Sequence, residues 1–125
     1  MQTQPTHPND RAIDLAPLHR LLQMAGTDGA PALLAALVDD MKSAQTGLDA
    51  AWSGPDYTLL RGHSHILIAL AGTVGDSDLQ TLAQQVNDAA NDQDSERIAF
   101  MRLIVKHGIE KLIASLMRLH LDVRA

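Results

Sequence analysis

Hydrophobic residues recur every three or four positions along most of the chain, which is the period of an amphipathic α-helix. No run alternates apolar and polar residues as a half-buried strand does, and there is no Asn-Gly hairpin signal. Glycine, proline and clustered polar residues divide the pattern into segments. The apolar stripes of these segments lie within residues 15–25, 34–51, 59–74, 79–90 and 98–119. The pattern therefore predicts an all-α protein.

Four of the segments are long, and short polar turns join them. Helices of this kind bury their stripes most simply as an up-and-down four-helix bundle. The first segment, which Gly26 ends, is predicted to be an additional short N-terminal helix that packs across one end of the bundle. Residues 1–10 are polar and contain two prolines, so we expect a flexible tail there and one helical domain over residues 11–125.

Several helix starts are predicted from capping and proline signals. The run Thr27-Asp28-Gly29-Ala30-Pro31 combines a capping side chain with a proline suited to a first turn, so a second helix is expected to begin there. Asp14 is expected to cap the short N-terminal helix. Pro55 follows Ser53 and Gly54 and is suited to the first turn of the next long helix after them. Ser77 and Gln80 have the spacing of a capping box, in which each side chain bonds a backbone N–H of the other residue.

The segment 59–74 has one apolar face and an unusual opposite face. With about 100° between successive residues, the face predicted to lie in the core consists of Leu59, His63, Ile66, Leu67, Leu70 and Val74. The opposite face has His65 near its centre, and the residues around it are Arg61, Gly62, Ile68, Ala69 and Gly72. Glycine costs about 1 kcal/mol relative to alanine inside a helix. Two glycines on this face are explained if another molecule must approach His65 closely.

Composition excludes several classes of function. The formal charge of −5 and the aromatic content of 2% argue against nucleic-acid binding, which needs a basic stripe or stacking side chains. The chain has no cysteine, so it has neither disulfides nor thiolate metal ligands. Its polar N-terminal residues resemble neither a signal peptide nor a membrane span, and we expect a cytoplasmic protein without a membrane partner.

Spacing around His65 resembles that of the histidine phosphotransfer (HPt) domains of two-component phosphorelays. In that family the motif His-x-Leu-Lys-Gly is followed by glycine, leucine and alanine, and here Leu67, Gly75, Leu79 and Ala83 occupy the second, tenth, fourteenth and eighteenth positions after His65. Upstream similarities are Ile13-Asp14-Leu15, Gly26-Thr27-Asp28, Leu33-Leu34 and Asp56. The resemblance therefore spans nearly the whole chain.

Two residues depart from the family motif. Ile68 stands where the family has lysine, and Ala69 stands where it has glycine. Alanine is still small, but isoleucine cannot balance phosphoryl charge as lysine does. Arg61 lies one turn before His65 on the same face, and we hypothesise that it partly replaces the lysine as the group that stabilises the phosphoryl group.

The resemblance implies a phosphocarrier rather than a turnover enzyme. His65 would accept a phosphoryl group from an aspartate of a response-regulator receiver domain or hybrid histidine kinase, and then pass it on. Magnesium would be held by the receiver, so the chain would need no cofactor of its own. Gly62, Ile68, Ala69 and Gly72 would form the surface on which the receiver docks.

Other interpretations remain open. Loss of the motif lysine is also compatible with a degenerate HPt-like bundle that docks to a receiver or kinase without being phosphorylated. The apolar flank around Phe100 and Leu103 indicates either a central helix or a dimerisation surface; we expect a monomer, with a weak homodimer as the alternative. No metal site is predicted, because inward positions are apolar and His63 and His65 face different ways. His63 is expected to be a buried neutral histidine.

Overall fold

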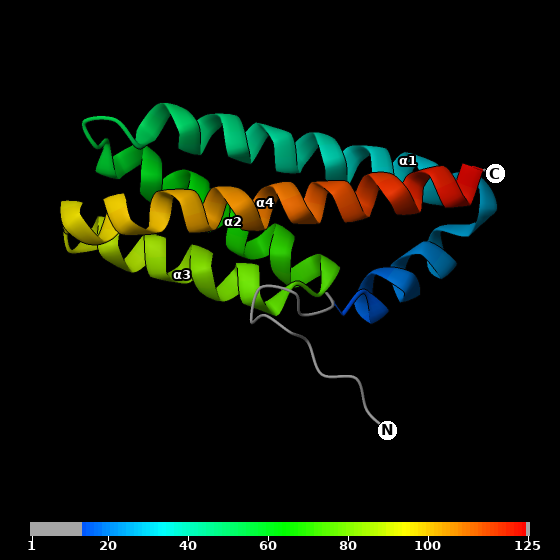
Figure 1. The fold of residues 1–125 in the computed structure, drawn as a ribbon. Helices are drawn as coiled ribbons and strands as arrows, with labels where there is room; N and C mark the ends of the chain where they lie inside the picture. Colours follow the sequence, from blue (N-terminus) through cyan, green and yellow to red (C-terminus); the bar gives the residue numbers. More distant parts are fainter. Residues whose placement is uncertain (1–13, 125) are drawn as a thin grey trace, which may run out of the picture.

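The protein consists of four helices in the computed structural model, which describes residues 14–124 (Figure 1). In chain order the helices are α1 (Ala16–Ala51), α2 (Tyr57–Val74), α3 (Ser77–Asn91) and α4 (Ser95–Arg124). Within the described residues no segment forms a strand, and the all-helical prediction is confirmed. The tail predicted at residues 1–10 lies outside the described range.

Successive helices run antiparallel, so the chain passes up and down the bundle (Figure 1). α1 and α3 each pack against both α2 and α4, whereas in the described part of the chain the diagonal pairs make no contact. The outer faces of α2 and α4 consequently point to opposite sides of the molecule. Leucine, isoleucine, valine, methionine and alanine fill the core, and its largest fully buried side chains include Leu34, Met41, Leu60, Leu67, Leu79, Ile109, Leu112 and Leu116.

The additional short N-terminal helix is not a separate element. Residues 16–25 belong to α1, and the break expected at Gly26 is a kink inside that helix, where the glycine has φ 78° and ψ 179°. The stretch before the kink bends away from the rest of α1 (Figure 1). Helical geometry resumes directly after Gly26, and Pro31 lies inside this second part of α1. The kink at Gly26 therefore takes the place of the turn expected between two separate helices.

Aspartates cap the three later helices. The Oδ1 atoms of Asp56, Asp76 and Asp94 accept hydrogen bonds of 3.1 Å from the backbone N–H groups of Leu59, Leu79 and Arg97, respectively. The capping box predicted for Ser77 and Gln80 is wrong, because Asp76 makes the cap and the Gln80 amide bonds α2 instead. Pro55 precedes the Asp56 cap and does not open the helix.

The core face of α2 differs from the predicted one by about one residue of rotation. Leu59 and Ile66 were expected inside, but they are 42% and 48% exposed. The buried residues of α2 are Leu60, Ser64, Leu67, Ala71 and Val74. Serine and alanine are small enough for α3 to lie close, and hydrogen bonds satisfy the buried Ser64 hydroxyl. The rotation of α2 about its axis is thus determined by close packing with α3 and not by hydrophobicity alone.

α1 is long and apolar enough, by length and composition, to cross a membrane. Core helices of bundles meet the same criteria, and α1 has a buried stripe that packs against α2 and α4. Its buried residues run from Leu18 to Ala51 along one side. Of the most apolar window of α1, 28% is buried in the bundle, so its packing accounts for part of its apolar character.

Candidate functional site

His65 lies at the middle of α2 and its side chain is exposed to solvent. Both ends of the helix are fixed: Asp56 caps the first turn, and Gly75 ends the last turn in the left-handed conformation, with φ 87°. The imidazole is thus presented from a rigid element and not from a loop.

His63 points to a different side of α2. It is partly buried, and its ring lies over Gly47 of α1, where any Cβ atom would overlap the imidazole. Residues two apart on a helix differ by about 200° in direction. His63 therefore packs between helices, whereas His65 faces water.

The four residues predicted to surround His65 as a docking surface differ in accessibility. Gly62 and Ala69 are exposed, and a Cβ atom on Gly62 would meet nothing within 4 Å. Gly72 is exposed on its outer side, but the Gln80 carboxamide lies where a side chain on residue 72 would be. Ile68 is partly buried and packs against the core. Packing against Gln80 thus explains the glycine at position 72. Gly62 has no such contact and leaves open space beside His65.

A row of amide side chains on α3 holds α2 in place. The Nε2 group of Gln80 donates to the carbonyl oxygen of Ile68 at 3.4 Å. The Nδ2 group of Asn87 donates to the carbonyl oxygen of Arg61 at 3.2 Å and to the Ser64 hydroxyl at 3.1 Å. Because α2 and α3 are antiparallel, these two contacts bracket His65 along the helix. The signal missed in the sequence is the 4-3-4 spacing of Gln80, Gln84, Asn87 and Asn91.

The row of amide side chains on α3 also includes Gln84, which is exposed. Gln84 lies one turn after Gln80 on the same side of α3, and the antiparallel register brings it level with the backbone of residues 64–65. The face around His65 is therefore composed of short side chains from α2 and uncharged amides from α3. It offers hydrogen-bond donors and acceptors beside the imidazole but no carboxylate from that row.

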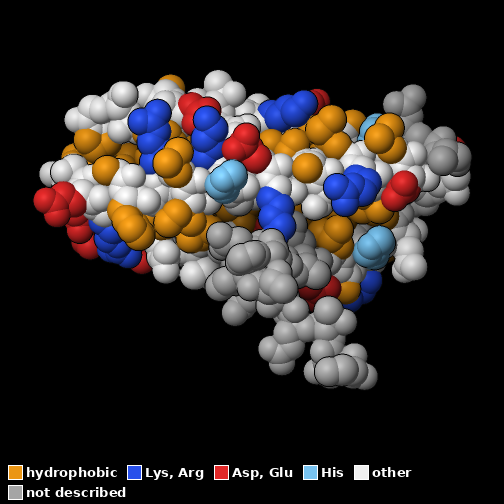
Figure 2. Space-filling view, in the orientation of Figure 1, with side chains coloured by type: hydrophobic (Ala, Val, Ile, Leu, Met, Phe, Trp, Pro, Cys, Tyr) orange, Lys and Arg blue, Asp and Glu red, His pale blue; other side chains and the backbone are white. Residues whose placement is uncertain are grey.

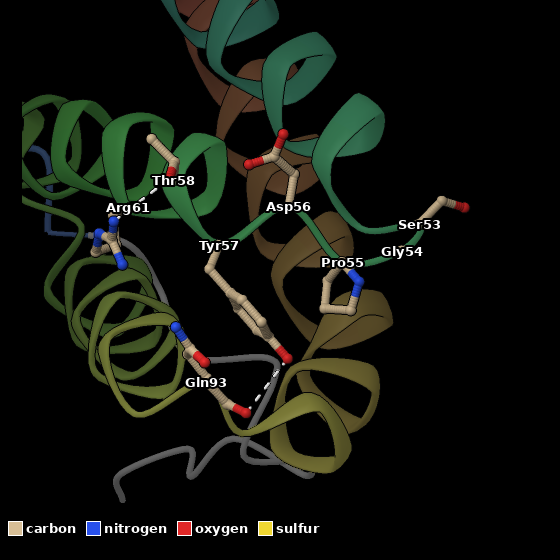
Figure 3. A pocket seen from close by; sticks show the side chains of 8 residues that line it. All are labelled: Ser53, Gly54, Pro55, Asp56, Tyr57, Thr58, Arg61 and Gln93. Carbon is tan, nitrogen blue, oxygen red and sulfur yellow. Dashed lines mark hydrogen bonds between the residues drawn. The ribbon is translucent and has the colours of Figure 1, made fainter.

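Arg61 lines an open pocket of about 450 Å³ at the start of α2 (Figure 3). Its Nη2 group donates to the Thr58 hydroxyl at 3.4 Å. On the other side of the pocket, the Tyr57 hydroxyl donates to the Gln93 carbonyl oxygen at 3.3 Å. The remaining lining residues are Ser53, Gly54, Pro55 and Asp56. Arg61 thus supplies positive charge one turn before His65, at the edge of the same face.

Chemically, the site offers an accessible imidazole, with the guanidinium of Arg61 one turn away and uncharged amides of α3 beside it. Neutral imidazole has a nitrogen lone pair that can attack an electrophile without a separate base. Among residues 14–124, no group of three or more His, Asp or Glu side chains could hold a metal ion together. The arrangement is suited to receiving a group from a partner that carries its own catalytic apparatus.

Comparison with protein-family models, curated protein sequences and solved structures finds no match to this chain.

Proposed function

We propose that this protein is a phosphocarrier that accepts a phosphoryl group on His65 and passes it to another protein, as HPt domains do in two-component phosphorelays. The observation that carries the proposal is the exposed imidazole of His65 at the middle of α2. The neighbouring residues Gly62 and Ala69 are small, so they leave the ring open to a partner. The four-helix architecture and the spacing of residues after His65 support the same reading.

The proposed reaction is transfer from an aspartyl phosphate of a receiver domain. A lone pair on the His65 imidazole forms an N–P bond as the P–O bond to the aspartate breaks, and the aspartate leaves as a carboxylate. The proton on the other ring nitrogen stays in place. Phosphoryl transfer needs mainly in-line positioning and charge stabilisation, and the receiver's magnesium would supply much of the latter.

The proposal places the protein in the cytoplasm, with a receiver domain or hybrid histidine kinase as its partner and no cofactor of its own. Gly62, Ile68, Ala69 and Gly72 would form the docking surface, with Arg61 beside it to balance phosphoryl charge. Ile68 would contribute only its exposed part, because the rest of the side chain packs against the core. The amides of α3 would extend this surface on one side.

A direct test is phosphorylation in vitro. The protein would be incubated with phosphoramidate, and separately with a panel of receiver domains phosphorylated by acetyl phosphate. We expect phosphate that is acid-labile and base-stable, located on the His65 peptide by mass spectrometry. The variant His65→Gln should take up none, whereas His63→Gln, the matched control two residues away, should retain uptake. Label on His63, or no histidine phosphate with any donor, would overturn the proposal.

A second function is favoured by Ile68, which supplies no cation one turn after His65. In this alternative the bundle binds a receiver or kinase through the same face but takes no phosphate. Calorimetry against the same receiver panel distinguishes the two. Binding that Ala69→Arg abolishes, without phosphate on His65, would support docking alone.

A further inference from the structure

The part of α1 before the kink, residues 16–25, forms an N-terminal arm that lies across one end of the bundle. The arm begins at the turn between α2 and α3, where a Cβ atom on Gly75 would overlap the Asp14 carbonyl oxygen and lie 2.9 Å from Pro17 Cδ. From this turn the arm crosses to the far end of α4, where the kink at Gly26 joins it to the rest of α1 (Figure 1).

The arm covers a part of α4 that α3 does not reach. The start of α3 lies level with Gly108 of α4, since a leucine Cδ1 atom from the first turn of α3 is 3.1 Å from the place of a Cβ atom on that glycine. α4 continues well past this level, yet its side chains Leu112 and Leu116 are fully buried. Leu18 and Leu22 of the arm are buried in the same hydrophobic cluster. The arm therefore closes the opening that the short α3 leaves beside α4.

A single residue, Gly26, separates the arm from the rest of α1. Its φ of 78° and ψ of 179° form a combination that is essentially restricted to glycine, whereas the residues on both sides are helical. A Cβ atom on Gly26 would meet nothing within 4 Å. Backbone conformation and not space therefore requires glycine at the kink. Helical φ and ψ at this one residue would make α1 a single straight helix of 36 residues.

A straight α1 would carry the arm out of its own bundle. The arm would project by about 15 Å at about 1.5 Å per residue, with Leu18 and Leu22 exposed and the opening beside α4 uncovered. A second straight copy has the same arm and the same opening, so each arm fits the other copy. Exchange of an identical element is a low-cost route to a dimer. We propose that the arm is exchangeable: kinked α1 gives a monomer, and straight α1 gives a dimer in which each arm closes the bundle of a second copy of this chain.

Protein concentration sets the balance between the two forms. Both forms bury the same surface of the arm, so they differ in the conformation of Gly26 and in the entropy lost when two copies join. Glycine adopts the kinked conformation without steric cost, and the monomer prevails in dilute solution. The dimer gains as the concentration rises. The inference does not depend on the proposed function, since arm exchange makes no use of His65.

Gly26→Ala tests the hinge, because alanine disfavours the kink and favours the straight helix. The protein is refolded from urea at concentrations up to about 1 mM, where weak association is measurable, and its mass is determined by light scattering. We expect the parent to dimerise at the upper end of this series, and Gly26→Ala to associate at least about tenfold more tightly. Gly54→Ala is the matched control: Gly54 also has a positive φ, of 116°, but lies in the turn after α1, so its replacement should not change the association constant. Insertion of two glycines after Gly26 should weaken association. A parent that stays monomeric throughout, or association that neither hinge variant changes, would overturn the proposal.

A second pair of variants distinguishes arm exchange from association through exposed hydrophobic side chains. Such side chains are visible between charged ones on the face shown in Figure 2, and Leu103 of α4 is 70% exposed. Leu18→Ser removes a fully buried contact of the arm, whereas Leu103→Asp changes only the exposed surface. In the parent and in Gly26→Ala, Leu18→Ser should leave a helical monomer by circular dichroism, and Leu103→Asp should leave the dimer intact. A dimer that survives Leu18→Ser would overturn arm exchange.

Discussion

The imidazole of His63 occupies the space that a side chain on Gly47 would need, so α1 and α2 approach each other through a glycine and a ring. This contact fixes the direction of His63 and, two residues on, leaves His65 on the solvent side. The position of the exposed histidine is thus coupled to a glycine in a different helix.

Substitution of Gly47 by alanine tests this contact. In a His63→Ala background, Gly47→Ala should stabilise the protein by about 1 kcal/mol, because alanine favours the helix over glycine. With His63 present, the new methyl group overlaps the ring, and the gain should be lost or reversed. The double-mutant cycle, measured by urea unfolding, should give an interaction energy of about 1–2 kcal/mol. Additive effects would show that His63 moves aside freely.

Asp76 gives a pH-dependent prediction. Burial raises the pKa of its carboxyl above the ordinary value of 3.8, and Asp78 adds to this, while the Leu79 N–H and Lys111 act in the opposite direction. A raised pKa means that the folded state holds the proton more tightly than the unfolded state. Its stabilising contribution is complete below pH 3.8 and is lost as the pH rises through the folded-state pKa.

The variant Asp76→Asn should therefore gain stability relative to the parent as the pH rises from about 3.5 toward 7. Asparagine keeps the cap of α3 nearly as well as aspartate does. Asp76→Ala should follow the same pH dependence but be about 1 kcal/mol less stable throughout, since it lacks the cap. Urea midpoints at several pH values measure all three proteins. A stability difference that shrinks toward neutral pH would contradict the assignment.

Much of the fold could be predicted from the sequence because hydrophobic periodicity and turn residues are local signals. Gly26 was identified as a break, and it has positive φ. The rotation of α2 was predicted wrongly because Ser64 carries no hydrophobic signal, and its burial depends on Asn87 in another helix. A helical-wheel projection of one helix contains no information about a hydrogen-bond partner on the next helix.

The candidate site shows the same division between local and distant signals. The exposure of His65 could be predicted from its angle relative to Leu67 and Val74, both of which are buried. The role of Gly72 could not be predicted, because the Gln80 amide of α3 occupies the space where a side chain on residue 72 would lie. Phosphate acceptance by His65 stays a prediction, since it depends on a partner.

Arg61 is predicted to assist phosphoryl transfer through its charge. Only its backbone carbonyl accepts bonds from Ser64 and Asn87, so Arg61→Ala leaves those structural contacts intact. If the guanidinium balances phosphoryl charge, Arg61→Ala should slow uptake at His65 at least about tenfold, because a hydrogen bond to a charged group contributes about 1.5–3 kcal/mol. Arg61→Lys should keep most of the rate, and Thr58→Val, which removes only the bond from Arg61 to Thr58, should change it little. Unaltered kinetics in Arg61→Ala would exclude the residue.

Ile68→Lys tests whether a missing cation limits the site. Ile68 is partly buried, but a lysine at this position can lay its methylene chain on the core and extend its ammonium group toward water one turn from His65. We expect a loss of about 1 kcal/mol in stability, because part of the apolar contact is removed. Phosphoryl uptake should become several-fold faster, or phosphohistidine longer-lived. Ile68→Gln is the matched control, since it has a polar side chain without charge and should share the loss of stability but not the gain in rate. If Ile68→Lys folds and takes up phosphate no faster than Ile68→Gln, the charge at this position is not what limits transfer, because the two variants differ chiefly in that charge.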